Sequence, residues 1–204
     1  YYSDQIKQAR EQNRICRVPY DPKLDVNTAW DLGYSDATSI IFYQQLGKEI
    51  RIIDYEEHTG ESLSFYAKLL KDKGYSYGTH FLPHDAASRR HTTGKSDQET
   101  LFEFDITNTE IVERADIQHG IQIVRNTFPR LWIDSEKCSH LIECISQYHK
   151  AFDDKKKVYR SRPEHDWSSH CADALRYLCV SLPEEMYIDD SNSYYDSIGG
   201  RLGR

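Results

Sequence analysis

Short apolar runs separated by turn residues occupy the first part of the chain, a pattern typical of β-strands. It predicts strands over residues 26–32, 38–45 and 49–55, and the short links between them favour an antiparallel meander. Residues 61–73 instead carry apolar side chains three and four positions apart, and Gly74 follows them. That spacing predicts a helix which ends at the glycine.

After this helix, strands and helices alternate. Residues 78–83 predict a fourth strand, and the helix before it lets the chain cross over, so that this strand lies parallel beside the first. The remaining pattern predicts a helix near 97–104, a strand near 109–113, a helix near 116–126, an amphipathic helix over 136–149, a hairpin over 150–161 and a last helix over 168–181. The expected fold class is therefore α/β, with a mixed β-sheet of three antiparallel strands and then parallel strands, flanked by helices.

The length of 204 residues predicts one domain with appendages. We assign residues 26–182 to this domain. Residues 1–25 contain two prolines and read as a connecting segment, and residues 183–204, rich in Ser, Tyr and Gly, read as a flexible C-terminal tail. The chain starts without Met, which is expected of a piece of a longer protein.

Composition narrows the class of protein. Hydrophobic residues make up 38% and charged residues 29%, which is typical of a soluble globular protein, and neither a signal peptide nor a membrane-spanning run is present. The net charge of −7 excludes a protein that coats nucleic acid non-specifically, but not one with a local basic strip. The five cysteines have no zinc spacing and are expected to be reduced, as in a cytoplasm.

Three aspartates lie where the predicted elements would bring them together. Asp31 interrupts the apolar first strand, and Asp85 follows the fourth strand, which is predicted to lie beside the first. In the last helix, His170 and Asp173 are three residues apart and share a face. Strands avoid aspartate, and a buried carboxylate without a partner is costly. We therefore expect a cation to compensate the negative charge of Asp31.

Convergent carboxylates repel one another unless a cation lies among them. Oxygen ligands without thiolates suit Mg²⁺ or Mn²⁺, and such a cluster can hold two ions for phosphodiester cleavage. Each residue also has an ordinary explanation: Asp31 at a sheet edge, Asp85 capping a turn, Asp173 paired with Arg176, and His170 bonded to the loop before its helix. Asp36 is most simply a turn residue, with metal ligation as the alternative. Because the predicted strand order would bring the three aspartates together, we favour a metal site of Asp31, Asp85 and Asp173.

Two basic segments are candidates for contacts with DNA phosphates. One is the loop after Asp85, and the other is the tip of the predicted hairpin. Their basic residues are Arg89, Arg90 and Lys95 in the loop, and Lys155, Lys156 and Lys157 in the hairpin. The loop ends in Gly-Lys-Ser but is not a phosphate-binding P-loop, because Arg89 stands where that motif needs glycine.

Three segments carry a resemblance to a known family. "WDLGYSDATSIIFYQ", "FLPHDAASRRHTTGKS" and "SSHCADALRY" resemble the nuclease domain of phage terminase large subunits, in the ribonuclease H-like superfamily, and "GIQIVRNTFPRLWID" is similar to a further segment of it. The resemblance covers roughly residues 26–180. It implies a ribonuclease H-like fold with catalytic aspartates at Asp31, Asp85 and Asp173, and with His170 as a further catalytic residue.

The resemblance also implies a function. A terminase nuclease domain is a metal-dependent endonuclease, using two Mg²⁺ or Mn²⁺ ions, that cleaves concatemeric double-stranded viral DNA during genome packaging. Its partners would be DNA, the terminase small subunit and the portal protein, in the host bacterial cytoplasm and away from membranes. An ATPase domain normally precedes it, and residues 1–25 would connect to that domain.

Other functions stay open at this point. A Holliday-junction resolvase or another ribonuclease H-like nuclease would share the chemistry and differ in substrate. A catalytically weak or inactive module that docks to the portal would keep the fold alone. An actin-like or sugar-kinase ATPase also uses Asp-x-Gly near a strand turn, but it needs two related domains, for which this chain is short.

Overall fold

The structure is a computed structural model that describes residues 1–33, 36–90 and 94–183. The elements in chain order are α1 (Ser3–Glu11), β1 (Ile15–Cys16), β2 (Val26–Asp31), β3 (Ala37–Leu46), β4 (Glu49–Thr59), α2 (Leu63–Lys73), β5 (Tyr77–Leu82), the 3₁₀ turn η1 (His84–Ala87), α3 (Asp97–Glu103), β6 (Thr109–Ile111), α4 (Ile117–Thr127), the 3₁₀ turn η2 (Phe128–Arg130), β7 (Leu131–Asp134), α5 (Ser139–Gln147), β8 (Lys150–Asp153), β9 (Val158–Pro163) and α6 (Ser169–Ser181).

Seven strands of the described chain form one mixed sheet, in the order β1-β7-β4-β3-β2-β5-β6. β2, β3 and β4 pair antiparallel, and the other strands join in parallel. The crossover through α2 brings β5 parallel to β2, as the sequence predicts. The expected mixed α/β sheet is confirmed.

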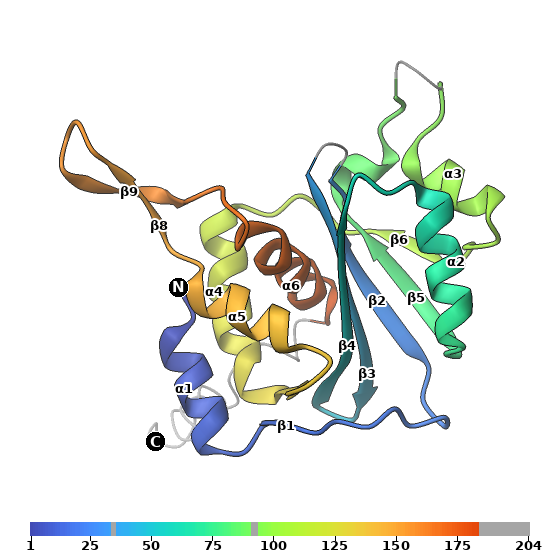
Figure 1. Cartoon of the computed structure of the whole chain (residues 1–204), viewed down its shortest axis with the longest axis horizontal. Helices are drawn as coiled ribbons and strands as arrows, with labels where there is room; N and C mark the ends of the chain where they lie inside the picture. The colour runs from blue at the N-terminus through green and yellow to red at the C-terminus, as the bar shows by residue number, and fades with distance from the viewer. Residues whose placement is uncertain (34–35, 91–93, 184–204) are drawn as a thin grey trace, which may run out of the picture.

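Helices cover both faces of this sheet (Figure 1). α1, α4, α5 and α6 lie on one face, and α2 and α3 lie on the other. Each face has its own core: Ile41 and Tyr43 pack toward α4, α5 and α6, whereas Ile40 and Phe42 pack toward α2. A strand buried on both faces needs a continuous apolar run, which explains why the middle of β3 does not alternate.

The hairpin of β8 and β9 extends away from this layered body (Figure 1). It spans residues 150–163, close to the prediction of 150–161. The helix predicted over 61–73 is also present as α2, where Ser62 caps the N-terminus by accepting the N–H of Phe65, and Gly74 ends it with a φ of 66°. Glycine suits that left-handed position because it lacks a Cβ.

Two strands were not predicted, β1 and β7. β7 is only four residues long, and a buried run of that length has no periodicity that marks it as a strand. The side chain of Asp134 at its end accepts the N–H groups of Val18, Glu136 and Lys137. The predicted helix 136–149 therefore begins later, at Ser139, because the turn bound by Asp134 occupies its first residues.

Residues 1–25 pack against the domain. Tyr2, Ile6 and Ala9 belong to the same core as α4, α5 and α6, and β1 pairs with β7 at the sheet edge. Their connection to an upstream ATPase domain stays a prediction, and the tail predicted over 183–204 lies, beyond residue 183, outside the described residues.

All five cysteines are free thiols, as expected from their spacing. Four of them are buried, and Cys16 is partly exposed. In the part of the chain that the structure describes, no helix has the length and apolar character needed to cross a bilayer.

Candidate metal-dependent nuclease site

Asp31 is the last residue of β2, where it pairs with Ser39 of β3. The chain turns sharply just after it. A Cβ on Gly33 would lie only 2.5 Å from the carbonyl oxygen of Ala37, so glycine is required for this close approach. The turn keeps Asp31 at the end of a central strand, half-buried and directed toward α6.

α6 places His170 and Asp173 on the face toward the sheet. Nδ1 of His170 lies 3.2 Å from Oδ2 of Asp31, which links two residues 139 positions apart in the chain. The spacing of three residues puts Asp173 on the same face of the helix, one turn later. His170 therefore contacts the predicted aspartate, and its ring also lies beside that of His165 in the loop before its own helix, with the ring centres 5.5 Å apart.

The electrostatics of these residues are coupled. Burial raises the pKa of Asp31, the negative charge of Asp173 raises it further, and the hydrogen bond from His170 opposes both. The hydrogen bond to Asp31 in turn raises the pKa of His170 above its ordinary value. A buried carboxylate next to a second carboxylate favours a nearby positive charge, which a proton or a metal cation can supply.

Asp173 also has a partner within its helix. Nη2 of Arg176 lies 3.0 Å from Oδ1 of Asp173, the ordinary pairing that its spacing allows. The Arg176 side chain is buried against α4, where Gly120 leaves room for it: a Cβ there would lie 2.5 Å from Cδ of Arg176. Asp173 is thus held from one side by arginine and remains partly exposed on the other.

Asp85 lies in η1, directly after β5. The parallel register pairs Ala29 with Phe81, so the C-terminal ends of β2 and β5 meet at the same edge of the sheet. Asp85 is exposed at this edge. The ligand atoms of Asp31, Asp85 and Asp173 do not all come within 4.8 Å of one another, and their role as metal ligands stays a prediction.

Glu57 is a carboxylate near this site that the prediction did not include. Asp31, Ser39 and Glu57 are opposite one another on three neighbouring strands. Burial by itself raises the pKa of Glu57, but hydrogen bonds from Tyr55, Ser39 and His140 outweigh it, and the pKa is lowered overall. The sequence places Glu57 only in an acidic patch at the rim of the site, because β4 was expected to end at residue 55, whereas it continues to Thr59.

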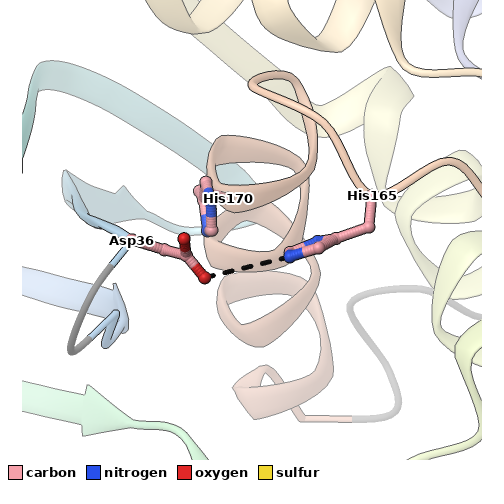
Figure 2. Close-up of side chains that lie close together, drawn as sticks. All are labelled: Asp36, His165 and His170. Carbon is pink, nitrogen blue, oxygen red and sulfur yellow. Dashed lines mark ion pairs between the residues drawn. The ribbon is translucent and has the colours of Figure 1, made fainter.

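A second group of polar side chains lies at the rim of the site. Asp36, His165 and His170 bring one ligand atom each to within 4.8 Å of one another. Figure 2 shows Asp36, from the segment just before β3, facing both rings. His165 precedes α6 and was not singled out in the sequence, because only the folded loop brings it to His170.

The basic residues predicted to contact DNA fall into two situations. Those of the loop after η1 pair with carboxylates of α3: Arg89 with Glu99, Arg90 with Asp97, and Lys95 with Glu103. Those of the hairpin, Lys155, Lys156 and Lys157, are exposed at its tip. The hairpin lysines project into solvent, and Nζ of Lys157 lies 3.6 Å from Oδ1 of Asp154, so the positive charge is partly compensated in both segments.

A cavity of about 400 Å³ lies between the base of the hairpin, α4 and α6. Arg160, Arg162, His165 and Asp173 are among its lining residues. Arg160 and Arg162 are two positions apart on β9, so they project to the same side of the strand. The sequence prediction did not include these two arginines. They line the same cavity as Asp173, whereas the lysines at the tip of the hairpin do not.

Comparisons with known proteins agree at the level of fold. No family model and no curated protein sequence matches the chain. Among solved structures, the large terminase of a thermophilic bacteriophage in complex with ADP has a TM-score of 0.66 and 14% identity over 87% of this chain, which spans 44% of that protein's length.

Isolated nuclease domains give similar values. The bacteriophage SPP1 large terminase nuclease domain with bound Mn has a TM-score of 0.55 and 17% identity, covering 75% of this chain and 84% of that one. The large terminase nuclease from thermophilic phage G20c with bound magnesium has a TM-score of 0.56 and 12% identity, covering 84% and 95%. The chain therefore has the same fold as these large terminase nuclease domains.

Proposed function

We propose that this chain is a metal-dependent endonuclease domain that cleaves concatemeric double-stranded viral DNA during genome packaging. The observation that carries the proposal is the hydrogen bond between Asp31 and His170, made at the end of β2 with Asp173 on the same helix face. Asp85 extends from the neighbouring strand end toward the same edge of the sheet. The likeness in fold to nuclease domains solved with Mn, Co and Mg supports the same function.

The residues present fit divalent ions. Asp31 is half-buried, and its burial together with the nearby charge of Asp173 raises its pKa, so a cation between them would relieve an unfavourable arrangement of charge. Asp31, Asp85 and Asp173 would hold two Mg²⁺ or Mn²⁺ ions through carboxylate oxygens. Bound there, such ions activate a water molecule and stabilise the leaving oxygen of the cleaved phosphodiester.

The protein side chains contribute positioning and proton transfer. His170 orients Asp31 through its Nδ1. Its imidazole would act either as a general acid that donates a proton to the leaving oxygen or as a nitrogen ligand of a cation. Arg176 fixes the rotamer of Asp173. These contacts hold two of the predicted ligands in place before DNA arrives, which lowers the cost of organising the site.

DNA would approach along the hairpin side of the site. Lys155, Lys156 and Lys157 at the tip, then Arg160 and Arg162 beside the cavity, form a local basic strip that leads to Asp173. Phosphate contacts of this kind position the duplex without reading its sequence. With a net charge of −7 over the chain, we expect DNA affinity to be weak and strongly dependent on salt.

The wider setting is part of the same proposal. The chain spans 44% of the length of the ADP-bound phage large terminase. By the resemblance to terminases, an ATPase domain, the terminase small subunit and the portal protein would act together with it. The host bacterial cytoplasm would be the site of action.

Conversion of supercoiled plasmid to nicked and linear forms tests the proposal. Mg²⁺ or Mn²⁺ should support cleavage without strong sequence preference, and EDTA should abolish it. Cleavage in EDTA would contradict the metal mechanism. A four-way junction cleaved in preference to duplex DNA would assign the chain to the resolvases instead.

A further inference from the structure

The side chains of Asp36, His165 and His170 converge on one point at the rim of the site (Figure 2). Nε2 of His165 lies 3.9 Å from Oδ2 of Asp36, and all three ligand atoms lie within 4.8 Å of one another. Two nitrogens and one oxygen make a different donor set from the three aspartates of the predicted Mg²⁺ or Mn²⁺ site. Of its three residues, His170 also belongs to the predicted catalytic set, whereas Asp36 and His165 belong to neither that set nor the basic strip.

Both imidazoles are oriented by a hydrogen bond at Nδ1. The ring of His170 is bonded there to the Asp31 carboxylate, at 3.2 Å. The ring of His165 is bonded there to Oγ of Ser169, at 3.0 Å, while the Ser169 hydroxyl donates to the carbonyl of Asp166. Because the serine proton is used by that carbonyl, His165 is the donor to Ser169.

These bonds leave the Nε2 lone pair of each ring for a cation. Histidines that bind metals commonly have this arrangement, in which the second ring nitrogen donates to a carboxylate or another oxygen that fixes the tautomer. The two rings come from the same short stretch of chain, and Asp36 comes from the far end of the turn after β2. The fold therefore brings together oriented nitrogen ligands and a carboxylate.

The spacing suits a small cation after modest movement. An ion about 2.1 Å from each donor in tetrahedral geometry needs donors about 3.4 Å apart. The observed 3.9 Å and the 4.8 Å limit require the side chains to close by about 1 Å or less on average, within the range of side-chain rotation at exposed positions. The side chains of His165 and Asp36 are 74% and 57% exposed, so they are free to make this adjustment.

We propose that Asp36, His165 and His170 form a binding site for a borderline transition-metal ion such as Zn²⁺, which adjoins the aspartate site for Mg²⁺ or Mn²⁺ through the bond between His170 and Asp31 and differs from it in its ligands. Imidazole nitrogen favours such ions, whereas Mg²⁺ strongly prefers oxygen ligands. Three protein ligands leave at least one coordination position for water or for an oxygen of a bound phosphate. The proposal goes beyond the nuclease function and does not require that the chain cut DNA.

Calorimetric titration of the protein with Zn²⁺ in saturating Mg²⁺, without DNA, tests the site. Mg²⁺ fills oxygen sites, so the remaining Zn²⁺ binding reports the histidines. We expect one Zn²⁺ to bind, and His165→Ala to weaken it by about tenfold or more. His119→Ala is the matched control, because His119 is exposed on α4 outside the cluster, and it should bind Zn²⁺ as the wild type does.

A second measurement separates the two sites. Co²⁺ in place of Zn²⁺ gives visible absorption bands that respond to nitrogen ligands, and these bands should be lost in His165→Ala and kept in Asp85→Asn. Unchanged Zn²⁺ affinity in His165→Ala, or no Zn²⁺ binding in saturating Mg²⁺, would overturn the proposal. Zn²⁺ binding that depends on Asp85 but not on His165 would assign the ion to the aspartates. None of these readouts requires DNA cleavage, so failure of the nuclease proposal would leave them interpretable.

Discussion

Gly120 of α4 is the position where the structure makes its sharpest prediction about stability. In an isolated helix, replacing an interior glycine with alanine stabilises by about 1 kcal/mol. Here the new Cβ would lie 2.5 Å from Cδ and 2.8 Å from Cγ of Arg176. These atoms are in the middle of the side chain, so the whole arginine must move.

Arg176 has little room to move. Its side chain is 8% exposed, Nη2 lies 3.0 Å from Oδ1 of Asp173, and its guanidinium carbon lies 4.9 Å from the centre of the Tyr177 ring. Overpacking of this kind costs about 1–3 kcal/mol, and loosening a buried ion pair adds to it. The sum exceeds the gain in helix propensity, so Gly120→Ala should lower the free energy of unfolding by about 1–2 kcal/mol.

A double-mutant cycle measured by urea unfolding checks this reasoning. In an Arg176→Ala background the obstruction is gone, and Gly120→Ala should then stabilise by about 1 kcal/mol, which reverses its sign. Gln122→Ala, on the exposed face of the same helix, is the control and should change stability by less than about 0.5 kcal/mol. Stabilisation by Gly120→Ala in the wild-type background would refute the argument.

Three further predictions concern the core and the DNA contacts. Burial lowers the pKa of His80 from 6.5 to about 4, so unfolding takes up a proton between these values, and stability should be full above pH 6.5 and fall by about 3 kcal/mol as the pH drops to 4. Urea unfolding across this range should show a weaker pH dependence in His80→Gln, and an unchanged one would contradict the assignment. Replacing Arg160 and Arg162 with Ala should weaken DNA binding and reduce the slope of log K against log salt by about 1 per residue, measured by fluorescence anisotropy. Replacing the loop residues Arg89, Arg90 and Lys95 together should weaken cleavage without changing metal affinity in calorimetry; a parallel loss of metal affinity would make the loop structural.

The parallel pairing of β2, which carries Asp31, with β5, which precedes Asp85, was predictable because it follows from topology. A helix between two strands implies a crossover, and a crossover makes parallel neighbours whose ends meet. The shared face of His170 and Asp173 likewise follows from helical spacing alone. These rules need only the order and type of the elements.

Features that depend on short segments or on long-range packing were not predictable. β1 has two residues and β7 has four, so both owe their strand conformation to pairing with the sheet rather than to any pattern of their own. Glu57 belongs to the site only because β4 continues past its apolar run, and His165 only because its loop folds back beside α6. The pairing of Arg90 and Lys95 with α3 likewise required the folded loop.

Cleavage of plasmid DNA by single aspartate variants tests the central claim most directly. Asp31→Asn, Asp85→Asn and Asp173→Asn keep the size of each side chain and remove its negative charge, so the fold should survive while the ions lose a ligand. With Mn²⁺ present, each variant should fail to nick or linearise the plasmid, whereas Asp72→Asn, exposed on α2, should cut as the wild type does. Wild-type cleavage by any one of the three variants would contradict the assignment of that aspartate and, with it, the metal site proposed here.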